Sequence, residues 1–162
     1  MKHLVLILII ALCSVSALGK GTPPTRATTT SVNIYLVALS DDGYSGKRIG
    51  CGDSLVKEVR TISPTNTPLK SAIEELLAVK EPIKKRVDLE LNNYWIGPDL
   101  KLKSATISRG TATIHFTGQI SVAGVCDEPR ITEQINAVAK QFASVKRVKV
   151  FVNGTALKQA IR

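Results

Sequence analysis

Apolar and polar positions follow the spacing of β-strands in four stretches of the chain. Residues 32–39 are apolar at both alternating sets of positions, which is typical of a central strand covered on both faces. Residues 102–109 and 111–117 predict a hairpin, and its second strand alternates strictly between apolar and polar side chains. Residues 148–152 carry valine at every second position and predict a last strand.

Two further stretches have the apolar spacing of helices. Thr67-Pro68 predicts a helix start, since a hydroxyl suits the cap position and proline suits the first helical position. Asp127 predicts the cap of a second helix with Pro129 in its first turn. The expected apolar stripes are Leu69, Ala72, Ile73, Leu76 and Leu77 in the first helix, and Ile131, Ile135, Val138, Ala139 and Phe142 in the second.

These elements predict an α/β protein of the α+β kind, with the order strand, helix, strand, strand, helix, strand. The economical arrangement is one four-stranded sheet with both helices packed on one face and a polar opposite face. Residues 55–62 predict only a short extended piece outside this sheet. Residues 81–99 predict a partly extended, exposed loop, which is long enough to be a candidate functional surface.

The amino terminus has the pattern of a signal peptide, expected to span residues 1–19. Lys2 and His3 precede an apolar run and then small residues, so that cleavage after Ala17 or Gly19 is expected. An uncleaved anchor is the alternative, although the run is shorter than a good spanning helix needs. Lipidation at Cys13 is disfavoured because the bulky Leu12 precedes it. Residues 20–31 predict a flexible linker, 32–157 a folded domain and 158–162 a basic tail.

Removal of the signal leaves two cysteines, Cys51 and Cys126. Outside the cytoplasm thiols tend to pair, so these two residues predict one disulfide. Two buried free thiols are the alternative. The expected location is therefore periplasmic, extracellular or on the outer side of the cytoplasmic membrane.

The charge balance favours anionic neighbours. Lys and Arg outnumber Asp and Glu by 22 to 13, giving a formal net charge of +9. Such a balance suits an anionic wall polymer or a membrane surface, or only keeps the surface soluble. Nucleic acid is not expected as a partner, because charge with one or two aromatics is not a reading motif. The candidate binding residues are Lys84, Lys85, Arg86, Tyr94, Trp95 and His115.

Catalytic and metal chemistry are weaker interpretations of the same residues. A nucleophilic pair of Cys51 with His115 conflicts with the expected disulfide. A disulfide would also bring Asp53 close to Asp127 and Glu128, as in a calcium site, but Asp127 is better explained as a helix cap and Asp53 as an acceptor for loop amides. One His and two Cys do not make a zinc site. We therefore expect no cofactor, no metal and no catalytic residue.

The two cysteine segments, Ile49–Val56 and Cys126–Ile131, also carry a family resemblance. Together with Thr67-Pro68-Leu69, Gly110-Thr111-Ala112-Thr113 and Val152-Asn153-Gly154, in this order, they resemble the GerMN domain of bacterial sporulation and spore-germination proteins. The resemblance covers about residues 32–157. It implies an extracytoplasmic module, similar to the ring-building modules of sporulation secretion complexes, that acts by assembly and not by catalysis.

Two functional hypotheses follow. The first is a cell-envelope module that assembles with itself or with an envelope protein partner. The second is a binding module for anionic or glycan wall material, which would use the polar sheet face and the loop from Lys84 to Trp95.

Overall fold

The computed structural model describes residues 29–162, and it confirms the α+β class. The predicted signal peptide (1–19) and residues 20–28 of the predicted linker lie outside the described residues. Among residues 29–162, no helix is both long enough and apolar enough to cross a membrane. The elements, in chain order, are β1 (Thr30–Ala38), β2 (Lys47–Arg48), the 3-10 turn η1 (Gly50–Gly52), β3 (Ser54–Ile62), α1 (Pro68–Ala78), β4 (Ile83–Arg86), β5 (Leu89–Asn92), β6 (Lys101–Ser108), β7 (Thr111–Thr117), α2 (Asp127–Lys140), β8 (Arg147–Val152), β9 (Thr155–Ala156) and α3 (Leu157–Ala160).

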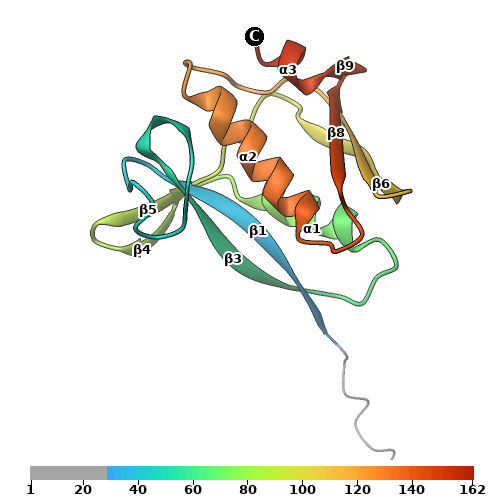
Figure 1. Cartoon of the computed structure of the whole chain (residues 1–162), viewed down its shortest axis with the longest axis horizontal. Coiled ribbons are helices and arrows are strands. Elements are labelled where there is room, and N and C mark those ends of the chain that lie inside the picture. The colour runs from blue at the N-terminus through green and yellow to red at the C-terminus, as the bar shows by residue number, and fades with distance from the viewer. Residues whose placement is uncertain (1–28) are drawn as a thin grey trace, which may run out of the picture.

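The strands form two sheets, not the single four-stranded sheet expected from the sequence. The first sheet has the strand order β2-β3-β1-β5-β4. β1 and β3 pair antiparallel along their whole length, from Thr30 opposite Ile62 to Ala38 opposite Ser54. Residues 55–62 are therefore a full strand and not a short extended piece. β1 has its long partner in β3, and it does not join β6, β7 or β8, which form the other sheet (Figure 1).

Residues 81–99 were expected to be a partly extended, exposed loop. Their first half is extended and largely exposed, but it is a paired hairpin and not a loop. β4 and β5 form an antiparallel hairpin with a bulge between Lys84 and Arg86. Leu91 anchors the hairpin because its side chain is fully buried in the core. This stretch has too few regularly alternating apolar residues to indicate a hairpin from the sequence.

The second sheet has the strand order β6-β7-β8-β9 and contains the predicted hairpin. Arg109 and Gly110 join β6 to β7 with positive φ angles of 47° and 75°, as a tight hairpin turn requires. α2 then carries the chain to β8, which pairs parallel to β7. One face of the sheet is buried through alternate residues of β7, namely Ala112, Ile114 and Phe116.

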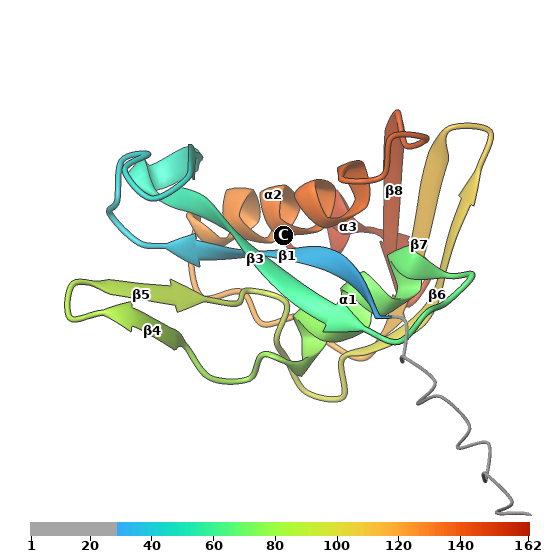
Figure 2. The ribbon, with the colours of Figure 1, turned by 90° about the horizontal axis from the view of Figure 1, so that it is seen from below.

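One core lies between the helices and both sheets. The predicted stripe of α1 is buried at Leu69, Ala72, Ile73 and Leu76. Both helices contact β1, and each also contacts the second sheet, α1 at β6 and α2 at β8. In Figure 2 the strands β6 to β8 run roughly upright at one end of the molecule, while β1 and β3 run across it.

α2 also completes the edge of β1 that β5 leaves open. β5 pairs with β1 only at Val37 and Ala38. Farther along this edge, the side-chain amide of Gln141 accepts a hydrogen bond from Asn33 N (2.8 Å) and donates one to Asn33 O (2.8 Å). Gln134 Nε2 donates to Tyr35 O at 2.8 Å. These two glutamines thus satisfy backbone groups that a further strand would otherwise pair.

The ends of the predicted domain need two corrections. Thr30 and Ser31 were assigned to the linker but belong to β1. Residues 158–162 were expected to be a basic tail, yet most of α3 lies there, and Leu157 and Ile161 are only 8% and 6% exposed. The apolar side chains at both ends of this short helix hold it against the core.

Candidate functional site

Cys51 and Cys126 form a disulfide that joins two distant parts of the chain. The two residues are 75 positions apart, with Cα atoms 5.9 Å apart. Cys51 lies in η1, just before β3, and Cys126 directly precedes α2. Cys51 is exposed and Cys126 is half-buried, so the bond lies at the surface. The bridge therefore fastens a loop of the first sheet to the start of α2.

A buried ion cluster lies beside this bridge. Arg130 Nε donates to Asp53 Oδ2 at 2.6 Å, and Arg130 Nη1 donates to Asp127 Oδ1 at 3.1 Å. The Asp53 side chain is 1% exposed and that of Asp127 is 9% exposed. Each carboxylate also accepts a backbone hydrogen bond, Asp53 from Ser40 N (2.9 Å) and Asp127 from Ala123 N (2.7 Å). We name Asp53, Arg130 and Asp127 the ion cluster.

Tyr94 covers the ion cluster. The guanidinium carbon of Arg130 lies 4.9 Å from the centre of the Tyr94 ring, which is the geometry of a cation–π contact. Burial raises the pKa of Tyr94, and the carboxylates of Asp127 and Asp53 raise it further, although Arg130 acts in the opposite direction. Burial alone would lower the pKa of Arg130, but the hydrogen bond to Asp53 and the charges around it raise that pKa above the ordinary value.

Of the two carboxylates, Asp53 has the role expected from the sequence and Asp127 does not. Asp53 accepts a loop amide, as expected. Asp127 is the first residue of α2, so it does not cap the helix; the cap position is held by Cys126, which makes no side-chain cap hydrogen bond. Arg130, a cation, already binds one oxygen of each carboxylate. Among residues 29–162, no group of three His, Cys, Asp or Glu side chains is arranged to hold a metal ion.

The basic triplet Lys84-Lys85-Arg86 lies on β4, the edge strand of the first sheet, and all three residues are exposed. Lys85 Nζ pairs with Glu58 Oε2 at 2.5 Å and Arg86 Nε with Asp88 Oδ1 at 3.1 Å. Two of the three charges are therefore already compensated by neighbouring carboxylates.

Trp95 was predicted to offer a stacking surface, and the structure places it instead in the core. Its side chain is fully buried, and its Nε1 donates to Ile131 O at 2.9 Å. The indole ring lies 4.4 Å from the Phe116 ring, measured between centres. A ligand at the surface cannot reach this ring, because the side chain has no exposed surface and its N–H is already bonded to α2.

His115 lies on the open face of the second sheet, which we name the outer face. Its ring stacks on Phe151 of β8, with ring centres 4.9 Å apart. The register places Lys149 beside Thr113 and Arg147 beside Thr111 on the same face. Cys51 belongs to the loop before β3 in the first sheet and is bonded to Cys126, so its sulfur is not a free thiol that His115 could activate.

Two functional side chains were missed from the sequence. Arg130 stands three residues after Asp127, the spacing at which opposite charges on a helix meet, and this spacing could have revealed the pair. Gln134 interrupts the apolar stripe of α2 while being fully buried. A polar residue at such a position signals a buried hydrogen-bond partner, but its partner, Tyr35, is far away in the sequence.

Comparison with known proteins gives one family match. The family model Germane, described as sporulation and spore germination, matches residues 17–158. No curated protein matches the chain significantly.

Two solved structures from Bacillus subtilis share the fold. The first GerMN domain of the sporulation protein GerM is similar with a TM-score of 0.55 and 21% sequence identity, over 80% of this chain and 86% of that one. The tandem GerMN domains of the same protein give a TM-score of 0.54 and 22% identity, over 85% of this chain. The present chain spans only 43% of the tandem structure.

Proposed function

The chain belongs to the Germane family of sporulation and spore germination, and from this membership we propose that it is a non-catalytic module of the cell envelope that works by assembling with protein partners. The similar structures carry GerMN domains of a sporulation protein. Its mode of action is binding to another protein without turnover.

The observation that carries this proposal is that the motif residues are already bonded to one another or to the backbone. Both cysteines are bonded to each other, and the carboxylates of Asp53 and Asp127 are bonded to Arg130 and to backbone amides. Polar groups that are already committed to structural bonds are not available as nucleophile, base or metal ligand. The most specific segments of the chain therefore build a rigid scaffold, which suits a docking module.

Export is part of the same proposal. A surface disulfide persists in an oxidising compartment and is rare in the cytoplasm. The pattern at residues 1–19 and the bond between Cys51 and Cys126 thus favour the same side of the membrane. We infer that the folded domain acts outside the cytoplasm.

Photocrosslinking in intact cells tests the assembly role. A photoreactive amino acid would replace one exposed residue at a time on each sheet, for example Val59 on β3, Lys84 on β4, Thr106 on β6 and Lys149 on β8. Assembly predicts that positions on one face yield a discrete adduct, either with one envelope protein or with a second copy, while the other positions do not. Equal, diffuse labelling from every position would contradict an assembly role.

A second candidate function is binding of anionic wall polymer by the outer face. The observation in its favour is that Lys101, Arg147 and Lys149 are exposed and form no ion pair among the described residues. The burial of Trp95 removes one aromatic group from this candidate. His115 and its stacked Phe151 remain half-exposed on that face.

Sedimentation with purified cell wall tests the second candidate. Binding through the outer face should fall as salt rises, and it should weaken in a Lys149→Glu variant. The matched control is Lys57→Glu, since Lys57 is exposed on β3 of the other sheet. Equal weakening by both substitutions would indicate general charge attraction and not a wall-binding face.

A further inference from the structure

β8 has an unpaired edge over most of its length. β7 pairs with β8 along one side, from Arg147 to Val152. On the other side, β9 pairs only with Phe151 and Val152. In the part of the chain that the structure describes, no strand lies beside Arg147–Val150 on this second side.

The backbone of this edge points its hydrogen-bonding groups outward at two residues. Arg147 N donates to Gly110 O and Asn153 N donates to Phe116 O, so the odd-numbered residues of β8 direct their amides toward β7. Because these directions alternate along a strand, Val148 and Val150 direct their N–H and C=O groups to the open side. No side-chain hydrogen bond within residues 29–162 reaches the backbone of either valine. By contrast, Gln134 of α2 and Gln141, the C-cap residue of α2, satisfy the open edge of β1.

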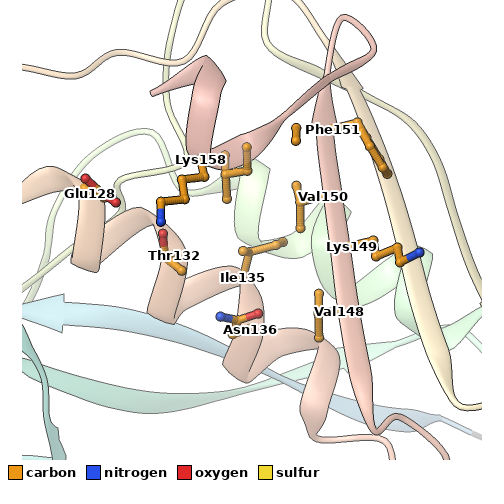
Figure 3. A pocket seen from close by; sticks show the side chains of 11 residues that line it. Glu128, Thr132, Ile135, Asn136, Val148, Lys149, Val150, Phe151 and Lys158 are labelled. Carbon is orange, nitrogen blue, oxygen red and sulfur yellow. The ribbon is translucent and has the colours of Figure 1, made fainter. Parts of the chain in front are cut away.

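A groove with both apolar and polar lining residues lies along this open edge. It separates α2 from β8 and has a volume of 570 Å³ (Figure 3). We name it the α2–β8 groove. Ile135 of α2 and Val148 and Val150 of β8 border it from opposite sides, and Lys158 of α3 reaches over one end. Leu157 also lines the groove, and α2 adds the polar side chains of Thr132 and Asn136.

The charges around the edge determine which kind of strand can pair with it. The exposed residues of β8 on the outer face are Arg147 and Lys149, and Lys158 adds a third cation at the groove. The groove lining includes one carboxylate, that of Glu128, in the first turn of α2. A second copy of β8 would bring Arg147 and Lys149 next to their own equivalents, and like charges on paired strands are unfavourable. An incoming strand with carboxylates at those positions would be favoured instead.

We propose that the open edge of β8 and the α2–β8 groove bind an extended segment of a partner protein in which apolar and acidic residues alternate. The segment adds a strand to the second sheet through the backbone of Val148 and Val150. Its apolar side chains lie in the groove against Ile135 and Leu157, and its carboxylates lie on the outer face beside Lys149 and Arg147. This inference rests on the proposed assembly function and assigns it a surface and a class of partner.

Peptides of defined sequence test the proposal with the folded, disulfide-bonded protein. The probe is a peptide of about six residues that alternates valine and glutamate, a usual strand length. The expected result is saturable binding by fluorescence anisotropy, with the largest amide shift changes and new protection from hydrogen exchange at Val148 and Val150. A peptide that alternates valine and lysine should bind at least about fivefold more weakly. N-methylation at alternate backbone positions should weaken binding about tenfold, because strand addition needs those N–H groups.

Two matched variants separate strand addition from general charge attraction. Lys149→Glu should weaken binding of the valine–glutamate peptide about fivefold. Lys101→Glu makes the same change of charge on β6 of the same sheet, across β7 from the groove, and should leave binding unchanged. Equal effects of the two variants, no effect of N-methylation, or no binding at millimolar peptide would each overturn the proposal. A dimer of the protein alone that protects Val148 and Val150 would overturn it in favour of self-pairing.

The photocrosslinking experiment keeps this proposal distinct from the proposed function. A discrete partner adduct from Val59 or Lys84, with none from Lys149, would preserve the assembly role and overturn the β8 edge as the docking surface. Diffuse labelling from every position together with failure of the peptides would overturn both.

Discussion

At the scale of single residues, the ion cluster shows how this chain compensates buried charge. Asp53 has a 1% exposed side chain and faces Arg130, which in turn binds Asp127. Burial removes the water that would stabilise each charge, so each depends on its partners. The pairing of one guanidinium with two carboxylates leaves the cluster with a net negative charge, and the amides of Ser40 and Ala123 stabilise it further.

Removal of the cluster's cation should strongly destabilise the protein. Arg130→Met leaves Asp53 buried without its ionic partner, and we expect the free energy of unfolding to fall by about 3–5 kcal/mol. Urea unfolding followed by the fluorescence of Trp95, the single tryptophan of the chain, measures this change.

The control is Lys70→Met, because Lys70 pairs with Glu74 on the exposed face of α1 with side chains 51% and 53% exposed. Its effect should stay within about 0.5 kcal/mol. Adding Asp53→Asn to Arg130→Met should recover part of the loss, since asparagine carries no charge. A further loss in that double variant would argue against an electrostatic origin.

Tyr94 should make the stability of the protein fall as the pH rises in the alkaline range. Its pKa is raised in the folded state, so the folded protein holds this proton more tightly than the unfolded chain does. The resulting stability is fully present below pH 10.0, the ordinary tyrosine pKa, and is lost as the pH rises through the higher folded value. Unfolding free energies measured across this range should fall less steeply in Tyr94→Phe. Identical slopes for the two proteins would contradict the prediction.

At the scale of elements, α2 has a double role. Its apolar stripe fills the core at Ile131, Ile135, Val138 and Ala139. Gln134 within the helix and Gln141 at its C-cap bond the free edge of β1. Gln134 Oε1 also accepts a hydrogen bond from Tyr94 N at 2.8 Å, so one buried amide ties α2 both to β1 and to the segment after β5. A buried amide with all its partners in place specifies a single register between helix and sheet.

Leucine is similar in size to glutamine, but replacing Gln134 by leucine should destabilise the protein more than the small change in size suggests. Gln134→Leu keeps the volume but leaves Tyr35 O and Tyr94 N without their partner, and we expect a loss of about 2–4 kcal/mol in unfolding free energy. Hydrogen exchange at the Tyr94 amide should accelerate.

The matched control is Gln159→Leu on α3, whose side chain is exposed and should change the stability by less than about 0.5 kcal/mol. If both variants destabilised equally, or if the Tyr94 amide kept its slow exchange, the bridging role of Gln134 would be refuted.

At the scale of the whole molecule, two sheets share one core because both helices contact both sheets. The chain visits the first sheet early and the second sheet late, and α2 returns alongside β1. The disulfide reinforces this long-range contact, since it links the loop before β3 to the start of α2. It closes a loop 75 residues long, which in the unfolded chain would otherwise be free to expand.

Reduction should consequently lower stability without abolishing the fold. The chain-entropy argument predicts a loss of about 4 kcal/mol for Cys51→Ser with Cys126→Ser, or for the protein in reductant. The ion cluster still joins the same two segments, so the folded state should persist at low urea. Urea unfolding with and without reductant measures the difference, and the double serine variant should show no response to reductant. An unchanged midpoint in the wild-type protein would rule out this stabilising role.

Local patterns determined much of this protein. The stripe of α1, the β6–β7 hairpin and the last strand follow from periodicities that depend only on neighbouring residues. The cysteine count after the predicted signal pointed to the pair that the structure bonds, and the motif segments pointed to the family whose model matches.

Only the tertiary structure decided which strands pair, which polar residues are buried and which surfaces remain free. β1 pairs with β3 and not with β6 to β8, and Trp95 is a core residue and not a binding surface. Gln134 bonds Tyr35 and Arg130 bonds Asp53, and both partners are far away in the sequence. Neither Tyr35 nor Asp53 can be recognised as a partner from nearby positions, because long-range pairing depends on which edges and cavities the rest of the fold leaves open. The open edge of β8 follows from the same cause: α2 bonds one sheet edge and leaves the other unpaired.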